Sequence, residues 1–247
     1  MPPRFYAPEL RPGLANVELP ADEAAHLTRV LRLRVGAEVC VFDGRGYQCI
    51  ARVSAAHKDV VRLEVLGPAG AAPEPRVRLT LAPALLKGDK LDDIIRDAVM
   101  LGVALIQPIV TDRIDVPAAS ASQRSRQQRW QRIAISSVKQ CGRAVVPEVR
   151  PPASLAACLG ADTSQLRIML VEPAAQAPAG SIQNLGRGSQ ITSALVLVGP
   201  EGGWTPQEIA SATRAGCQLV TLGRRTLRAD AAPTIAVAVL QAVWGDL

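Results

Sequence analysis

The chain has 247 residues, enough for one large domain or two modest ones, and 48% of them are apolar, which excludes a disordered chain. Its net charge is +6, and the whole excess lies in residues 113–150, which hold eight Lys/Arg against two Asp/Glu. The first residues form no signal peptide and no window approaches a membrane span, so we expect a cytoplasmic protein without membrane contact.

The N-terminal quarter reads as a small β module. Residues 38–42 and 47–53 alternate with period two around the turn dipeptide Asp43-Gly44, which predicts a β-hairpin. A further strand over 60–65 and one helix over 21–33 complete the pattern of a small β-barrel-like domain.

A linker is predicted over residues 67–75, where Pro, Gly and Ala collect with almost no large apolar side chain. We therefore expect two domains, 1–72 and 76–247.

Beyond the linker the rhythm changes to strand, helix, strand. Residues 90–101 carry apolar positions at helical spacing and end at Gly102. The spacing favours an α/β domain with a largely parallel sheet. The expected strands are 77–82, 103–110, 166–171, 194–198 and 217–222, and a last helix covers about 231–244.

The basic stretch predicts a helix over about 123–141. Arg129, Arg132, Lys139 and Arg143 fall within an arc of about 80° beside an apolar arc, so one face can pack while its neighbour meets phosphate. A solvated basic face is the alternative. The first helix also ends in three arginines, which either favour the helix dipole or contact RNA. The expected RNA-binding residues are Arg29, Arg32, Arg34, Arg129, Arg132 and Lys139.

The sharpest local feature is the loop Gly199-Pro200-Glu201-Gly202-Gly203, which follows an apolar strand. The next helix is marked by Thr205 as N-cap, Pro206 at its first position and Glu208 three residues after the cap. Glycines there let the backbone approach a ligand closely, although an ordinary tight turn between a strand and a helix has the same glycine-rich sequence. The loop lacks G-x-G-x-x-G and G-x-x-x-x-G-K-[ST], so dinucleotide oxidoreductase and P-loop functions lose their signatures.

A second loop, residues 222–230, leaves the next strand and opens the last helix. Two such loops at the carboxyl ends of consecutive strands stand where open α/β sheets bind ligands. The pair Gly199-Pro200-Glu201-Gly202-Gly203 and Leu222-Gly223-x-Arg225-x-Leu227-Arg228 resembles the cofactor signature of the ribosomal RNA small subunit methyltransferase E family. Val30-Leu31-Arg32, Lys87-Gly88-Asp89-Lys90 and Gln140-Cys141-Gly142-Arg143 extend the resemblance over nearly the full length.

The resemblance implies a SPOUT-type parallel sheet with a C-terminal trefoil knot, preceded by a PUA-like RNA-binding domain. It implies transfer of a methyl group from S-adenosylmethionine to N3 of a uridine in 16S ribosomal RNA of the small subunit, by a homodimer. The cofactor residues that it implies are Val171, Glu172, Gly199, Glu201, Gly202, Gly203, Leu222, Gly223, Leu227 and Arg228.

Three residues are candidates for the chemistry. Uracil N3 is a poor nucleophile while protonated, so a proton acceptor or a cation that stabilises the imide anion is needed. Glu201 and Asp230 are the candidate bases, although each could instead fix its loop; Arg143 is expected to orient the uridine, with phosphate contact as its alternative. The cysteines form no C-x-x-C pair and no carboxylate–histidine cluster has ligand spacing, so we predict no metal.

The sequence departs from the family pattern at a few positions. Met100 and Lys139 stand where acidic residues are usual, and Ala229-Asp230-Ala231 replaces Thr-Glu-Thr, which keeps the carboxylate and removes two hydroxyls. Two alternatives therefore stay open: a knotted methyltransferase acting on tRNA or on a ribose hydroxyl, and a non-catalytic RNA-binding assembly factor.

Overall fold

The computed structural model describes residues 2–57, 60–114, 120–173, 179–182, 185, 190–244 and 247. They form two compact units. The smaller unit takes the residues up to Glu74 together with Ile135–Val146, and the larger unit takes Pro75–Ala134 together with Pro147–Leu247. None of the helices in the described ranges has the length and apolar content of a membrane span.

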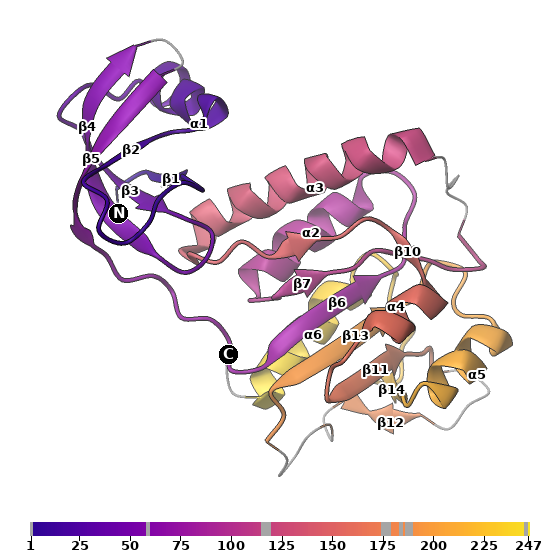
Figure 1. The fold of residues 1–247 in the computed structure, drawn as a ribbon. Helices are drawn as coiled ribbons and strands as arrows, with labels where there is room; N and C mark the ends of the chain where they lie inside the picture. The colour runs from indigo at the N-terminus through magenta and orange to yellow at the C-terminus, as the bar shows by residue number, and fades with distance from the viewer. Residues whose placement is uncertain are drawn as a thin grey trace. The chain divides into compact units, whose positions relative to one another are not determined.

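The smaller unit contains a five-stranded sheet in the order β1-β3-β4-β5-β2, in which only β1 and β3 are parallel (Figure 1). Phe5, Leu27, Val41 and Leu63 belong to its fully buried core. The strands are β1 Arg4–Tyr6, β2 Asn16–Glu18, β3 Glu38–Phe42, β4 Gln48–His57 and β5 Val60–Pro68.

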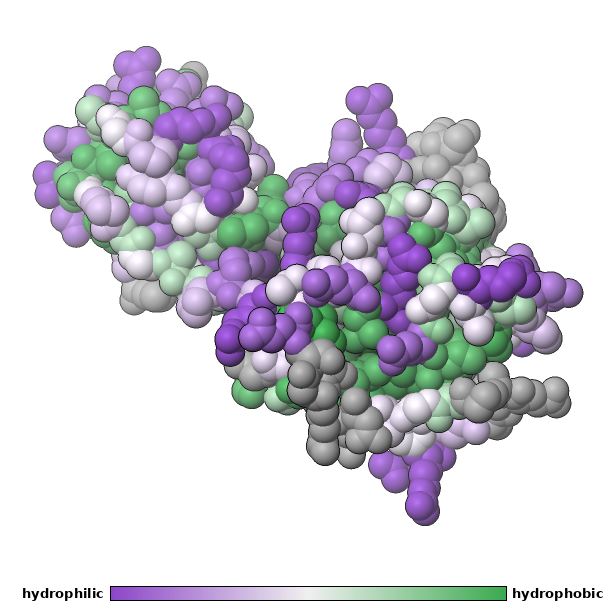
Figure 2. Space-filling model, turned by 60° about the horizontal axis from the view of Figure 1, so that its bottom comes forward, coloured by the Kyte–Doolittle hydropathy of each residue, from purple (hydrophilic) through white to green (hydrophobic). Residues whose placement is uncertain are grey.

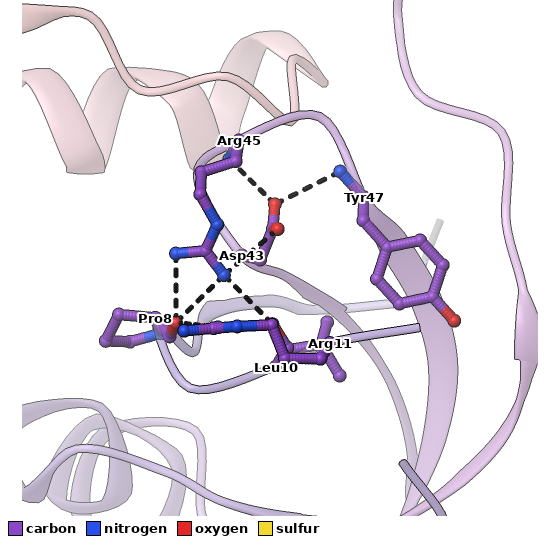
Figure 3. A network of polar contacts seen from close by, with 6 residues as sticks. All are labelled: Pro8, Leu10, Arg11, Asp43, Arg45 and Tyr47. Carbon is purple, nitrogen blue, oxygen red and sulfur yellow. Dashed lines mark hydrogen bonds and ion pairs between the residues drawn. The ribbon is translucent and has the colours of Figure 1, made fainter. Parts of the chain in front are cut away.

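The predicted hairpin is confirmed as β3 and β4, and its turn is held by Asp43. The Asp43 carboxylate accepts hydrogen bonds from the backbone N–H groups of Arg45 (2.7 Å) and Tyr47 (3.1 Å). The Arg45 guanidinium in turn donates to the carbonyl oxygens of Pro8 and Leu10, as Figure 3 shows. The turn is therefore fixed to the segment that follows β1.

The predicted helix over 21–33 is shorter than expected and changes its winding. It runs as α1 (Ala21–Ala25) and continues as a π-helical turn, His26–Val30. The chain then passes through Arg32, which adopts φ 53°, in the left-handed region. A residue with positive φ cannot be part of a right-handed helix, so the helix ends before the position predicted for it.

The larger unit holds a mainly parallel sheet in the order β12-β14-β11-β13-β6-β7-β9. In Figure 1, α4 lies in front of this sheet and α6 behind it, where α6 packs against α2 and β6. The main strands are β6 Arg78–Pro83, β11 Leu166–Leu170, β13 Ser193–Val198 and β14 Gln218–Thr221, with short β7 Leu105–Ile106, β9 Glu148–Val149 and β12 Gly180–Ser181. The helices are α2 Lys90–Met100, α3 Ser120–Cys141, α4 Leu155–Ala161, α5 Pro206–Arg214 and α6 Ala232–Trp244.

The prediction of one continuous strand over 103–110 is wrong. β7 stays in the main sheet, whereas β8 (Ile109–Val110) pairs with β10 (Ala153–Ser154) in a separate two-stranded sheet and keeps only an isolated bridge from Ile109 to Ala84, just after β6. Pro108 lies between β7 and β8 and has no N–H to donate to a ladder, which explains why the strand is interrupted there. The other strands and the helices α2, α3 and α6 confirm the predicted α/β pattern. The trefoil knot stays a prediction.

Hydrophobic residues reach the surface of the larger unit. The face drawn in Figure 2 has a broad hydrophobic area bordered by hydrophilic residues. Among the exposed large apolar side chains of this unit are Met100 on α2 and Ile235 on α6, two helices that pack together.

Candidate active site

A cavity of about 550 Å³ opens in the larger unit at the carboxyl ends of three neighbouring strands. Its walls come from most of the residues in three segments, 170–173 at the end of β11, 198–204 at the end of β13 and 222–232 after β14, and Lys90 at the start of α2 adds a fourth side. This volume lies within the range of small-molecule sites, and the position is the one expected from the strand ends.

The glycine-rich loop is shaped by the indole of Trp204. A Cβ on Gly199 would lie 3.0 Å from Cε2 and Nε1 of that ring, so only glycine fits without movement. Nε1 donates a hydrogen bond of 2.7 Å to the carbonyl oxygen of Leu170. Trp204 therefore ties the loop after β13 to the end of β11, two of the three walls.

Gly203 and Gly202 have different structural reasons. Gly203 has φ +67°, and a Cβ there would lie 3.4 Å from a carboxylate oxygen of Glu172. Gly202 is not among the residues that line the cavity: its carbonyl accepts a 2.9 Å hydrogen bond from Arg113, and a Cβ would come within 3.0 Å of the Cβ of that arginine. A larger residue at 202 would therefore press on the segment around Arg113 and not on the cavity itself.

The predicted helix start at Thr205 is confirmed. Thr205 Oγ1 accepts from the backbone N–H of Glu208, and the Glu208 carboxylate accepts from the backbone N–H of Thr205 at 2.8 Å, a complete capping box with Pro206 at the first position. Glu208 also accepts a 2.9 Å hydrogen bond from the backbone N–H of Asp112. These hydrogen bonds fix the end of the glycine loop to the first turn of α5, and they fix that turn to the backbone at Asp112.

Two ion pairs stand at the cavity wall. Lys90 Nζ donates to Glu201 Oε1 at 2.6 Å, and the Arg228 guanidinium donates to both carboxylate oxygens of Asp230 at 3.0 and 2.6 Å. Burial alone would raise the pKa of Glu201, but a hydrogen bond and charge from Lys90, with a backbone hydrogen bond, bring the pKa below its ordinary value. The Arg228 hydrogen bond is the main cause that lowers the pKa of Asp230. Both carboxylates are therefore ionised at neutral pH, and each has a cation beside it.

The structure brings most of the predicted cofactor residues together. Val171, Glu172, Gly199, Glu201, Gly203, Leu222, Leu227 and Arg228 line the cavity, and so does Asp230. Gly202 and Gly223 do not, and Gly223 has φ +101° with open space around it, which makes it a turn glycine. Arg143 belongs to the smaller unit, where it is 3% exposed and its guanidinium forms a two-pronged ion pair with Glu74.

Sequence reasoning missed Lys90, Trp204, Arg225 and Thr226 as wall residues. Two of them carried a signal. Trp204 is a large aromatic at the end of a glycine loop, and Lys90 is a cation at the first position of a helix, where the helix dipole disfavours it.

The predicted RNA-binding residues fall into two groups. Arg129 is held by Asp89 at 3.0 Å and by Asp92, and Lys139 donates to both oxygens of Glu23 at 2.8 and 2.9 Å. Arg32, Arg34 and Arg132 are exposed and have no acidic partner in the described part of the chain. Arg29 ends the π-helical turn.

No group of three His, Cys, Asp or Glu side chains that could hold a metal ion is found within the described ranges. The two histidines lie in the smaller unit, away in sequence from the residues that line the cavity.

Comparison with known proteins identifies the family on both units. A family model described as an RNA methyltransferase domain matches residues 73–241, and one described as an RNA methyltransferase PUA domain matches residues 19–66. The chain is 34% identical over 233 residues to the ribosomal RNA small subunit methyltransferase E of Synechocystis, a match covering 93% of this chain and 74% of that protein. The Bacillus subtilis protein of the same name is 26% identical over 225 residues, with 89% and 87% covered.

Solved structures agree over the whole length. A ribosomal RNA small subunit methyltransferase E from Neisseria gonorrhoeae, bound to S-adenosyl methionine, is 34% identical, with a TM-score of 0.89 and all of both chains covered. A Legionella pneumophila protein solved with the bound cofactor SAM is 27% identical, with a TM-score of 0.86 and 98% of each chain covered. With its family match, its curated relatives and its fold in agreement, the chain belongs to the ribosomal RNA small subunit methyltransferase E family.

Proposed function

We propose that the chain transfers the methyl group of S-adenosylmethionine to N3 of a uridine in 16S ribosomal RNA, on the assembled small subunit. The observation that carries this proposal is the 550 Å³ cavity, whose walls include both signature loops of the family. The family relationship and the cofactor named for two solved relatives support the choice of methyl donor.

The residues of the cavity fit this cofactor. Leu170, Val198, Leu222 and Leu227 supply apolar wall for an adenine ring, and the Glu172 carboxylate offers an acceptor for hydroxyl or ammonium groups. Gly199 and Gly203 line the cavity with backbone atoms alone. When bound, the cofactor supplies a methyl group already activated by its sulfonium, so the protein mainly has to position the nucleophile and manage charge.

Glu201 and Asp230 are proposed to face the uracil. Their role is to hold the cations of Lys90 and Arg228 in place, and not to accept a proton themselves. Their ion pairs with Lys90 and Arg228 lower the pKa of each carboxyl, which makes both weak proton acceptors. Arg143 stays the residue predicted to orient the uridine. Its ion pair with Glu74 also gives it a structural role, and an experiment has to separate the two roles.

RNA binding is proposed for exposed arginines in each unit. In the smaller unit, Arg29, Arg32 and Arg34 follow one another around a backbone strained at Arg32, a feature that clusters at functional sites. In the larger unit Arg132 is exposed, whereas Arg129 must leave its carboxylates to contact phosphate. Three phosphate contacts from Arg32, Arg34 and Arg132 give a log–log salt slope of about 2, using roughly 0.7 per contact. A flat salt response would remove these residues from the interface.

A homodimer in the cytoplasm is part of the proposal. α6 is apolar over most of its surface, yet Ile235 on it is 39% exposed and Met100 on the adjoining α2 is 44% exposed. A helix that is apolar on all sides is normally buried, so a second copy of the chain is the proposed cover. Light scattering at working concentration tests this, and a monomer would contradict it.

The experiment that tests the function incubates the protein with labelled S-adenosylmethionine and small ribosomal subunits isolated without the modification. Naked 16S RNA and tRNA serve as parallel substrates, and nucleoside mass analysis identifies the product. N3-methyluridine from subunits supports the proposal. Label in tRNA or in a ribose methyl group supports the alternative knotted methyltransferase, and cofactor binding without transfer to any RNA supports an assembly factor.

A further inference from the structure

Lys90 is a cation in an unfavourable place along its helix. It is the first residue of α2, after the N-cap Asp89, and the positive end of a helix dipole repels a lysine there. The next residues of this turn, Asp92 and Asp93, have the charge that the position favours. A residue that lowers the stability of its own helix is expected mainly where function requires that residue.

The surroundings of Lys90 point to the cavity. It lines the cavity, its side chain is 36% exposed, and Nζ lies 2.6 Å from Glu201 Oε1 in the loop after β13. Its charge also acts on Asp230, in the loop after β14. Lys90 thus stands beside both signature loops without belonging to either, and a ligand in the cavity can reach it.

We propose that Lys90 is a catalytic residue of the methyl transfer, whose ammonium group stabilises the negative charge on a uracil carbonyl oxygen as N3 loses its proton. Glu201 is then a positioning residue that holds the Lys90 side chain at the cavity wall. This inference rests on the proposed function and adds the group that makes the imide nucleophilic.

The step balances without a protein base. The N3 proton leaves to hydroxide of the solvent, and the electron pair that remains on the imide is stabilised by Lys90. That pair forms the bond to the methyl carbon, while the pair of the broken carbon–sulfur bond stays on sulfur. Glu201 and Asp230 keep their negative charges throughout, because each already accepts hydrogen bonds from its cation.

The first test is the single-turnover rate of methyl transfer to small subunits by Lys90→Gln and Lys90→Arg, with cofactor affinity measured by calorimetry. Removing one electrostatic donor costs about 10²–10³-fold in rate in comparable sites. We expect that loss in Lys90→Gln with cofactor affinity within threefold of wild type, and at least one tenth of the wild-type rate in Lys90→Arg. Arg96→Gln removes the same charge from the same helix, at a residue paired with Asp93 outside the cavity wall, and should leave the rate unchanged.

The second test is the pH profile, which a merely structural lysine would not change. Raising the pH ionises the uracil imide without help, so the deficit of Lys90→Gln should shrink toward pH 9. In a Lys90→Gln background, Glu201→Gln should cause little further loss of rate, because Glu201 acts through Lys90. A deficit that is constant with pH, or a further loss of tenfold or more from Glu201→Gln in the Lys90→Gln background, would overturn the inference. If wild type makes no N3-methyluridine, the proposed function fails first; if wild type does and Lys90→Gln matches it, only the role of Lys90 fails.

Discussion

The Trp204 indole occupies the space beside Gly199 that any side chain at residue 199 would need, since a Cβ there lies 3.0 Å from two ring atoms. The ring cannot slide away freely because its Nε1 is hydrogen-bonded to Leu170. We expect Gly199→Ala to lower the free energy of unfolding by about 1–3 kcal/mol, as overpacking does, and to weaken cofactor binding at least tenfold. Denaturant unfolding and calorimetry measure the two effects.

Gly160→Ala is the matched control. Gly160 lies in α4, where a Cβ would meet nothing within 4 Å, so the same substitution should raise the free energy of unfolding by about 0.5–1 kcal/mol. Equal effects of the two variants would show that the indole does not constrain residue 199.

Arg32 is predicted to lower the stability of the folded protein and to contact RNA. A non-glycine residue at φ 53° carries a cost of about 1–2 kcal/mol, which glycine avoids while losing some chain entropy. Arg32→Gly should therefore stabilise the protein by up to about 1 kcal/mol and lower the salt slope of RNA binding by about 0.7. Arg34→Gly should lower the slope equally without the gain in stability. An unchanged slope in Arg32→Gly would exclude a phosphate contact there.

Arg143 and Glu74 should act as one structural unit. Arg143 is 3% exposed, and a lysine cannot reproduce its two-pronged hydrogen bonding to Glu74. We expect Arg143→Lys and Glu74→Gln each to lower the free energy of unfolding by about 2 kcal/mol, less than a fully buried pair because Glu74 is partly exposed. If Glu74→Gln is neutral and Arg143→Lys lowers only the rate of transfer, the predicted catalytic role is supported instead.

The carboxyl of Asp230 should titrate below its ordinary range because Arg228 donates two hydrogen bonds to its charged form. A lowered pKa in the folded state contributes stability that is fully present above about pH 4 and is lost as the pH falls through the lowered value. Carbon-detected NMR of the carboxyl gives its midpoint directly. Arg228→Gln should move this midpoint up toward the ordinary range; a midpoint that does not move would assign the shift to another cause.

The cysteines should divide by burial. Burial raises the pKa of Cys49, Cys158 and Cys217 to about 11, and Cys40 is also buried, so little thiolate forms at pH 8. Cys141 alone of the five is only half-buried. A thiol reagent should therefore modify one cysteine rapidly in the native protein and the other four only on unfolding.

Local patterns predicted those parts of the fold that neighbours in sequence determine. The hairpin at Asp43, the capping box at Thr205 and helix α2 each depend on residues a few positions apart. The π-helical turn left no mark in the hydrophobic period because it keeps Leu27 buried as a regular helix would, and one residue with positive φ, Arg32, does not alter that period. The division of 103–110 at Pro108 depends on a partner strand that lies more than forty residues away in sequence.

The parts of the candidate site that are formed by the backbone of the two loops could be predicted from the sequence. The parts that depend on contacts between side chains far apart in the sequence could not. Both signature loops were found from their glycines and their position after strands. Lys90 was not, because its ion pair with Glu201 joins residues 111 positions apart. Likewise Lys139 and Arg129 fit a basic arc on the helix, and only the fold shows that Glu23 and Asp92 already neutralise them.

The smaller unit combines the residues up to Glu74 with Ile135–Val146. Its synthesis therefore begins first, but its fold cannot be completed until the ribosome has also made the second segment. Arg4 donates to the carbonyl oxygens of Gly142 and Arg143, and Gly44 pairs with Val145, so the N-terminal unit lacks these partners until residue 146 has left the ribosome. By then more than half of the chain has been translated. A nascent chain stalled before that point should still be digested by protease in its first 74 residues, whereas one released beyond it should resist.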